Sequence, residues 1–320
     1  MKPFNVFPYD SNIDFMRLRM ASLVVAALIM FVGIGGMFVK GFNFALDFTG
    51  GVGIELAYDK PVDVEGVRKR LAAAGYESAQ VQTFGTGKEL LIRLRDESAN
   101  KKAGGDDATA SIAESVRVTA SEPGNPAKKL RSAEISAQVG RELAENGIYA
   151  LLFVVLGFLM YISFRFEWKF AVAAIITTLH DVVVVAGWFA LSGHEFDLTV
   201  LAGVLSVMGY SINDTIVVFD RVRENFRGMR ASPAEVLNKS INQTLSRTVI
   251  TSFVAFLTVL ALYLYGGGSL KGMAESQMLG IIIGTLSSIF VACPLLLWLG
   301  VSKQDLMPKA RDEAALARRP

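Results

Sequence analysis

An aspartate inside an apolar stretch is the first feature of this sequence that could do chemistry. Asp214 lies toward the end of the stretch 198–219, where Ser211 and Asn213 are its polar neighbours. A carboxylate at the centre of a transmembrane helix costs about 2.5–3.5 kcal/mol on insertion scales. Poor solvation disfavours the ionised form, so a carboxyl group there can bind and release protons near neutral pH. The sequence therefore predicts that Asp214 acts in a proton relay, with Ser211 and Asn213 as supporting polar groups.

Helical spacing indicates which way this carboxyl group points. On a helix, Gly203, Tyr210, Ser211 and Asp214 share one face that is small and polar. Such a face suits contact with other helices or trapped water better than contact with lipid. We expect Asp214 to face the interior of a helix bundle.

A histidine–aspartate pair lies in a second apolar stretch, 170–191. Asp181 follows His180, and Thr177 precedes Asp181 by one helical turn. Two acids at bilayer depth are costly to retain, which favours a buried polar path with Asp181 as a second relay residue and His180 as its support. An equally weighted alternative is that both side chains only hydrogen-bond to neighbouring helices.

A cation begins a further apolar stretch, 248–265. Arg247 shares a face with Thr244 and Thr251. From position alone, the favoured interpretation is a flanking residue whose long side chain reaches the lipid headgroups. The alternative is a cation that tunes the proton affinity of Asp214, with Thr251 as a supporting polar group.

Six stretches are apolar enough and long enough to cross a bilayer, which takes about 20 helical residues. They are 20–39, 147–164, 170–191, 198–219, 248–265 and 278–299. With 52% hydrophobic and 19% charged residues, the composition is that of a polytopic α-helical membrane protein. The first stretch is longer than the apolar region of a signal peptide and lacks an A-x-A-like cleavage site, so we expect a retained helix.

The remaining chemistry is sparse. A formal net charge of +2 provides no basic field for nucleic acid, and one cysteine with two histidines is too few for a convincing zinc site. No phosphate-cradling loop and no nucleophile–base pair is apparent, so we expect no enzymatic activity, no cofactor and no metal. Gly280 and Gly284 match a small-xxx-small pattern that predicts close helix packing, and Pro294 predicts a kink beside Cys293.

Lysine and arginine cluster in alternate loops, and this bias sets membrane orientation. The loops 165–169 and 220–247 are basic, as are both ends of the chain, whereas the loops 192–197 and 266–271 hold a single lysine. We therefore expect both termini to be cytoplasmic. Within 220–247, Ser232 and the residues after it predict a short helix on the inner membrane face.

These boundaries divide the chain into parts. We expect a cytoplasmic N-terminus 1–19, a membrane helix 20–39, an external domain 40–146, a membrane domain 147–300 and a cytoplasmic tail 301–320. Strands and helices in the external domain follow the order β-α-β-β-α-β, which predicts a small α+β domain of ferredoxin-like fold. The polar segments 96–106 and 122–126 are predicted to be linkers.

Several motifs together resemble the SecD/SecF family of bacterial protein-export membrane subunits, within the RND superfamily. They are Asp47-Phe48-Thr49-Gly50-Gly51, Phe164-Arg165-Phe166-Glu167-Trp168, Leu179-His180-Asp181-Val182, Gly209-Tyr210-Ser211-Ile212-Asn213-Asp214-Thr215, Asp220-Arg221-Val222-Arg223-Glu224-Asn225 and Ser246-Arg247-Thr248. Their order and spacing extend the resemblance over nearly the whole chain.

The resemblance implies a role and partners. It implies half of an RND-type bundle completed by a SecD subunit, in the bacterial inner membrane, serving the SecYEG translocon and the translocating preprotein, with YajC as a further partner. Proton flow would drive movements of the external domains. The family's Asn-Asp acid corresponds to Asp214 and its fifth-helix arginine to Arg247, which favours a functional Arg247. The motif with Asp47, Thr49, Gly50 and Gly51 would lie as a hinge where the first helix meets the external domain.

Two rival functions remain open from the sequence. A stand-alone proton-driven exporter of small molecules would form a substrate cavity without a six-helix partner. A non-transporting assembly scaffold would use Asp181 and Asp214 only for packing. An intramembrane protease is the least favoured class.

Overall fold

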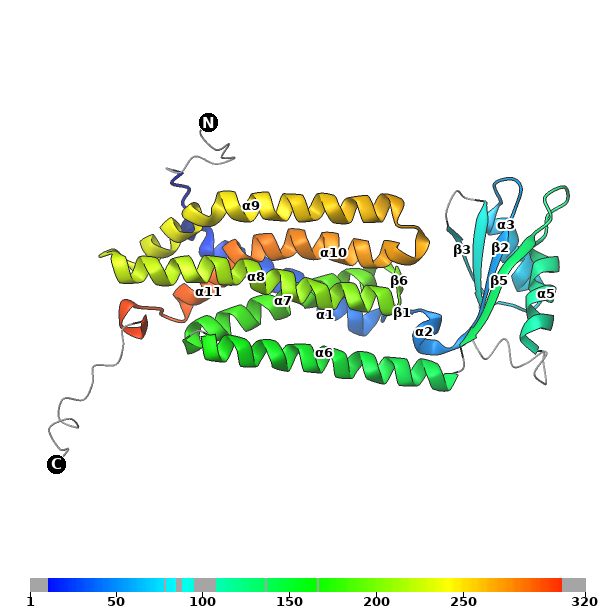
Figure 1. Ribbon diagram of the computed structural model, residues 1–320, viewed down its shortest axis with the longest axis horizontal. Coiled ribbons are helices and arrows are strands. Elements are labelled where there is room, and N and C mark those ends of the chain that lie inside the picture. The colour runs from blue at the N-terminus through cyan, green and yellow to red at the C-terminus, as the bar shows by residue number, and fades with distance from the viewer. Residues whose placement is uncertain are drawn as a thin grey trace, which may run out of the picture.

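A helix bundle and a small α+β domain lie end to end in the computed structural model of the chain (Figure 1). The structure describes residues 11–77, 79–84, 88–94, 108–135, 137–165 and 167–306. The predicted linker 96–106 lies outside these residues. The expected combination of a polytopic helix bundle with a small α+β domain of ferredoxin-like fold is confirmed.

The described residues include six helical spans long and apolar enough to cross a membrane. They are α1 (Arg19–Val39), α6 (Ala137–Arg165), α7 (Trp168–Ser192), α8 (Leu198–Gly228), α9 (Pro233–Tyr265) and α10 (Gly268–Ser287) with its continuation. The spans of α7, α8 and α10 are between 50% and 61% buried, whereas those of α1, α6 and α9 are between 6% and 17% buried. The central helices therefore supply the interior, and the other three supply the outer faces.

The last membrane span is not one regular helix. After α10 the backbone forms a π-helical turn, η2 (Ser288–Ala292), and then α11 (Cys293–Trp298). Proline has no amide hydrogen and its ring crowds the preceding turn. The wider turn η2 lies directly before Pro294, the residue predicted to kink this span.

The segment 220–247, predicted to be a cytoplasmic loop, differs from its prediction. It is not a loop carrying a separate short helix: α8 continues to Gly228 and α9 already begins at Pro233. Ser232 does cap a helix, because its Oγ accepts a hydrogen bond from Glu235 N at 3.4 Å, but that helix is α9 itself. The polar residues belong to helix ends that extend beyond a 20-residue apolar span, and polarity alone suggested a loop. For the same reason α6 begins ten residues before 147, at Ala137.

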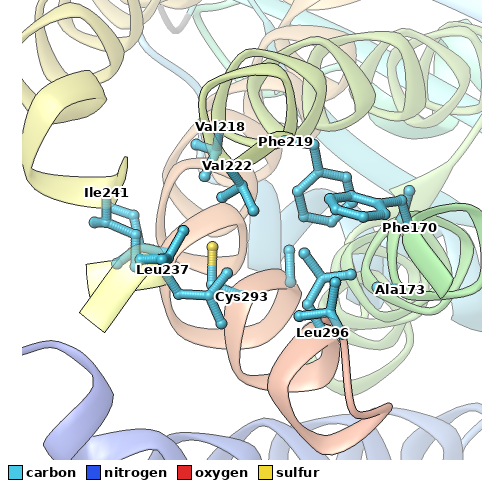
Figure 2. Close-up of a cluster of buried hydrophobic side chains, with 14 of the residues drawn as sticks. Phe170, Ala173, Val218, Phe219, Val222, Leu237, Ile241, Cys293 and Leu296 are labelled. Carbon is cyan, nitrogen blue, oxygen red and sulfur yellow. The ribbon is translucent and has the colours of Figure 1, made fainter. Parts of the chain in front are cut away.

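Side chains from several helices form an apolar core (Figure 2). One of these helices, α11, lies at the end of the bundle away from the α+β domain (Figure 1). Phe170 of α7 and Phe219 of α8 meet edge to face with ring centroids 5.3 Å apart. Cys293 is completely buried beside Leu237 and Ile241 of α9. The single cysteine is thus a packing residue.

The α+β domain, which the sequence predicts to be external, has one four-stranded antiparallel sheet with strand order β3-β4-β2-β5. Its elements are β2 (Gly51–Ala57), α3 (Val64–Ala73), β3 (Gln80–Phe84), β4 (Glu89–Leu94), α5 (Ala108–Ala120) and β5 (Lys128–Ile135). Ile54 and Ile92 are register partners and are fully buried, as is Val67 of α3. Alternation along the strands leaves the other sheet face free of this core.

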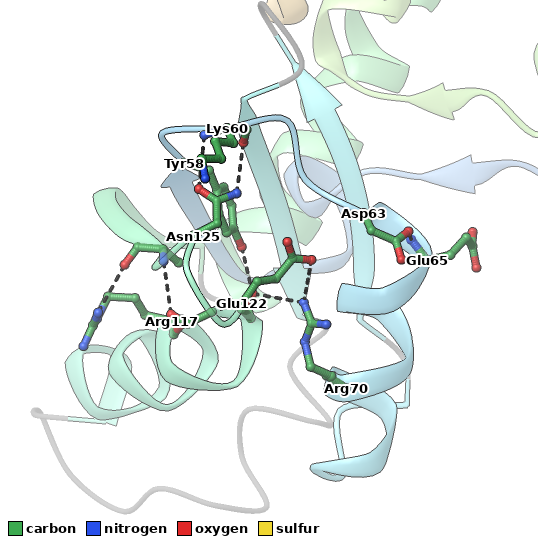
Figure 3. A network of polar contacts seen from close by, with 11 residues as sticks. Tyr58, Lys60, Asp63, Glu65, Arg70, Arg117, Glu122 and Asn125 are labelled. Carbon is green, nitrogen blue, oxygen red and sulfur yellow. Dashed lines mark hydrogen bonds and ion pairs between the residues drawn. The ribbon is translucent and has the colours of Figure 1, made fainter.

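The segment 122–126, predicted to be a linker, is instead tied to the domain (Figure 3). Asn125 is 6% exposed, and its side chain accepts from Lys60 N and donates to Lys60 O, both at 3.1 Å. Arg70 pairs with Glu122 at 3.0 Å. Side-chain hydrogen bonds order a segment whose composition alone indicated mobility.

Short elements join the two parts of the molecule. These are β1 (Asn43–Phe44), which pairs in parallel with β6 (Glu195–Phe196), and α2 (Leu46–Thr49). We call this group of three elements the rim. The rings of Phe42, Phe44, Phe48 and Phe196 pack together there, with centroid distances between 4.9 and 6.1 Å.

Candidate proton-relay site

Asp181 lies at the contact of three central helices, α7, α8 and α10, and its side chain is completely buried. Its Oδ2 accepts hydrogen bonds from Ser211 Oγ at 2.6 Å and from Ser287 Oγ at 2.7 Å, and its Oδ1 lies 2.9 Å from His180 Nδ1. Hydrogen bonds of this kind offset the cost of burying a carboxyl group. Asp181 therefore ties the three central helices together.

Asp214 is also buried, with 3% of its surface exposed, but its carboxyl group has fewer and longer hydrogen bonds than that of Asp181. Ser252 Oγ of α9 lies 3.4 Å from its Oδ2, a long hydrogen bond. The Ser252 hydroxyl has a nearer acceptor in Thr248 O at 2.7 Å, and it accepts from Tyr210 Oη at 2.8 Å and Thr285 Oγ1 at 2.7 Å. A proton gained or lost at Asp214 would disturb one weak contact, since Ser252 keeps its other partners.

The two carboxyl groups share the helices that hold them. Ser211, which donates to Asp181, precedes Asp214 on α8 by about one helical turn. On α10, Thr285 bonds to Ser252 and Ser287 bonds to Asp181. We call these residues, with His180 and Tyr210, the polar core. Its two halves are connected through α8 and α10.

Further polar atoms surround this core. Among the described residues, His180 Nε2 and the hydroxyls of Thr178, Thr215 and Thr248 are buried without a hydrogen-bond partner. Thr215 is the neighbour of Asp214, and Thr248 lies one turn before Ser252. Buried polar atoms normally have a hydrogen-bond partner. These atoms can therefore form further hydrogen bonds in the region of the two carboxyl groups.

Three of the residues predicted to take part lie apart from the core. Asn213, Arg247 and Thr251 are exposed, and the Thr251 hydroxyl bonds only to its own helix, to Arg247 O and Thr248 O at 3.0 Å. Within the described part of the chain the Arg247 guanidinium has no hydrogen-bond or ion-pair partner. Its charge acts on Asp214 through space.

Three hydroxyls of the core, those of Ser252, Thr285 and Ser287, were not among the residues predicted from the sequence. The signal for the last two was present, because Thr285, Ser287 and Ser288 form a polar run inside an apolar stretch. Ser252 follows Thr248 by one turn, on the buried face of α9.

The predicted hinge motif forms part of the rim. Asp47 Oδ2 accepts a hydrogen bond from Leu198 N at 3.2 Å, at the first residue of α8. Thr49 Oγ1 donates to Ala45 O at 3.2 Å and closes the short helix α2. Gly50 and Gly51 have φ values of 70° and 133°, which side chains rarely adopt, and lead directly into β2. The motif thus connects the start of α8 to the central part of the external sheet.

Fold and site together define a class: a polytopic membrane protein with buried carboxyl groups in its central helices and a small α+β domain attached through a glycine motif. The family described as protein export membrane protein SecD/SecF, C-terminal, matches residues 116–302, and the SecD/SecF GG motif matches residues 35–62. The chain therefore belongs to the SecD/SecF family of protein-export membrane proteins.

Relatives match along nearly the full length. The chain is 44% identical to the protein translocase subunit SecF of Pseudomonas aeruginosa over 94% of this chain and 96% of that protein. It is 39% identical to that of Escherichia coli O157:H7, over 94% of this chain and 93% of that protein. The SecDF subunit of Brucella abortus is 35% identical over 97% of this chain but only 40% of its own length.

Solved structures agree with the fold. A crystal structure of SecDF, a translocon-associated membrane protein from Thermus thermophilus, matches with a TM-score of 0.80 and 37% identity, over 93% of this chain and 40% of that one. SecDF in a super-membrane-facing form matches with a TM-score of 0.66, over 99% of this chain and 41% of that one. The chain thus spans about two fifths of the SecDF chains.

Proposed function

We propose that this chain is one half of a proton-driven unit that promotes export of preproteins across the bacterial inner membrane, and that Asp214 takes up and releases the proton. The observation that carries the proposal is the state of Asp214, which is 3% exposed yet has one hydrogen bond of 3.4 Å. One charge crossing a potential of 100 mV releases about 2.3 kcal/mol, enough to shift a two-state equilibrium of that size.

A SecD-type subunit would supply the other half. SecDF relatives contain the matching region in about 40% of their length, which leaves room in the same chain for a second half. Asn213 and Arg247 are exposed on spanning helices, where contact with lipid is costly for charged and amide groups. A partner that covers them would bring Arg247 into a less solvated position beside Asp214.

The wider assembly follows from the same family relation. We propose SecYEG and YajC as further partners, the emerging preprotein as the cargo, and a cytoplasmic location for both termini. Relatives that match this chain over more than nine tenths of its length are named protein translocase subunits, which favours this function over a stand-alone exporter of small molecules.

The test introduces the substitution Asp214→Asn into the full complex of this chain and its partner subunit. Export is measured in inverted membrane vesicles. Asparagine keeps the size and much of the hydrogen bonding but cannot titrate. We expect the acceleration of preprotein export by an imposed proton gradient to disappear, while export without the gradient is retained. The matched control is Asp220→Asn, at a half-exposed site on the same helix. Export that still accelerates normally in the Asp214→Asn complex would contradict the proposal.

A further inference from the structure

The guanidinium of Arg93 in the α+β domain lies near carboxylates of the rim and of the first turn of α8. Arg93 of β4 forms an ion pair with Glu195 of β6, and their side chains are only 20% and 15% exposed. Asp47 and Asp197 also act electrostatically on Arg93. The contact between the two parts of the molecule is therefore charged on both sides, with opposite signs.

A second, neutral contact lies beside it. Gln80 Nε2 of β3 donates to Asn43 Oδ1 of β1 at 3.0 Å. Gln80 and Arg93 are register partners on neighbouring strands, so they share one face of the sheet. The next pair, Val81 and Ile92, is buried in the domain core on the opposite face. The free face of the sheet is thus the one that contacts the rim.

The carboxylates in this contact belong to the start of α8. Asp197 is the N-cap of that helix and accepts from Val200 N at 2.7 Å, and Asp47 accepts from Leu198 N at 3.2 Å. Glu195 lies two residues before the cap. Because α8 continues without a break to Asp214, a shift or tilt of this helix moves the acids that hold Arg93.

Burial makes this attachment sensitive to loss of one partner. Burial lowers the pKa of the Arg93 guanidinium, and the charges of Asp197 and Asp47 oppose that effect. Removing one member of a poorly solvated ion pair leaves the other charge uncompensated. Exchanging both members restores opposite charges at the two positions, but Asp47 and Asp197 then repel the carboxylate at position 93.

We infer that Arg93 is a positioning residue that clamps the external domain onto the N-terminal end of α8, so that movement of this helix changes how the domain is attached. The covalent path through Gly50 and Gly51 allows rotation, and the Arg93 clamp selects one orientation. The clamp consists of the Arg93–Glu195 ion pair and the neighbouring hydrogen bond from Gln80 to Asn43. Its role in export rests on the proposed function, in which α8 responds to protonation of Asp214.

The test exchanges the charges in the complete membrane complex. The variants are Arg93→Glu, Glu195→Arg and the two combined. Spin labels on cysteines at Val118 of α5 and Tyr265 of α9, both exposed, report the distance between domain and bundle, and the native Cys293 is buried. We expect a narrow distance distribution in the parent and a broad one in each single variant. The double variant should be narrower than either single variant, but not as narrow as the parent, because Asp47 and Asp197 repel a carboxylate at position 93.

Export is measured in the same variants. We expect each single variant to lose at least roughly fivefold of the gradient-stimulated export, the lower end of typical coupling between sites, and the double variant to recover part of it. The control is Lys128→Glu, which breaks an exposed pair with Asp59 in the same domain and should change neither readout.

Outcomes separate the clamp from the proposed function. An unchanged distance distribution in Arg93→Glu would overturn the clamp. A broadened distribution with unchanged gradient-stimulated export would overturn its coupling role. Failure of the proposed function would show instead as gradient stimulation that persists in Asp214→Asn, whatever the distances are.

Discussion

Asp181 and Asp214 are both buried, but they differ in what a proton would disturb. Three contacts between 2.6 and 2.9 Å surround Asp181, and they come from three helices. Asp214 has a single contact at 3.4 Å from a hydroxyl that has a closer acceptor. These contacts favour Asp181 as an anchor of the bundle and Asp214 as the group that changes its protonation.

Removing one donor tests the anchor. We expect Ser287→Ala to destabilise the protein by about 0.5–1.5 kcal/mol, since an intramolecular hydrogen bond contributes on this scale. Thermal unfolding of the purified protein in detergent measures the effect. Thr258→Ala is the control, because that hydroxyl is exposed and bonds only to Val254 O of its own helix. Equal losses in the two variants would show that Asp181 does not hold the helices together.

Among the elements, α1 and α7 meet backbone to backbone. A Cβ built on Gly187 would lie 2.5 Å from the Cα of Gly33, and one on Gly33 would lie 3.2 Å from Val183 O. In the predicted small-residue pattern on α10, a Cβ on Gly280 would overlap the side chain of Val207, whereas a Cβ on Gly284 would lie 3.4 Å from the Cα of Ser211, an ordinary contact. Glycine here permits close approach, and the close approach brings the polar side chains within hydrogen-bond reach.

Adding one methyl group at the first of these contacts has a defined outcome. Gly187→Ala must push α1 and α7 apart, and we expect a loss of about 1–3 kcal/mol, the usual cost of overpacking. Gly157→Ala on α6 meets no atom within 4 Å and should be neutral or stabilise the helix by up to about 1 kcal/mol. Thermal unfolding of both variants compares them, and an equally harmless Gly187→Ala would refute the close contact.

On the scale of the whole molecule, orientation can be read from accessible cysteines. Ala231, in the turn between α8 and α9, and Asp59, in the external domain, are exposed at opposite ends of the molecule. We expect a membrane-impermeant maleimide to label Asp59→Cys in spheroplasts and Ala231→Cys only in inverted vesicles. Labelling of Ala231→Cys in intact spheroplasts would reverse the proposed topology.

Sequence reasoning reached the architecture because its signals are local. Apolar length predicted the spans, and the β-α-β-β-α-β order predicted the external fold. Contacts between distant residues were beyond it. Ser287 and Asp181 are 106 positions apart and meet only after three helices pack. Arg93 was likewise one strand residue among many until the fold placed it beside Glu195. Arg247 could be recognised in the sequence as a cation at a membrane helix. That its side chain is exposed follows only from how the helices pack.

The π-helical turn Ser288–Ala292 has a consequence for comparing this chain with its relatives. A π turn contains one residue more than an α turn. The helices before and after it can therefore each direct their side chains independently of the other. Ser287 stays directed at Asp181 while Cys293 and Leu296 stay in the apolar core. A deletion elsewhere in this span would rotate everything downstream by about 100°. An alignment with a relative whose final helix is regular therefore needs its single-residue gap within this turn.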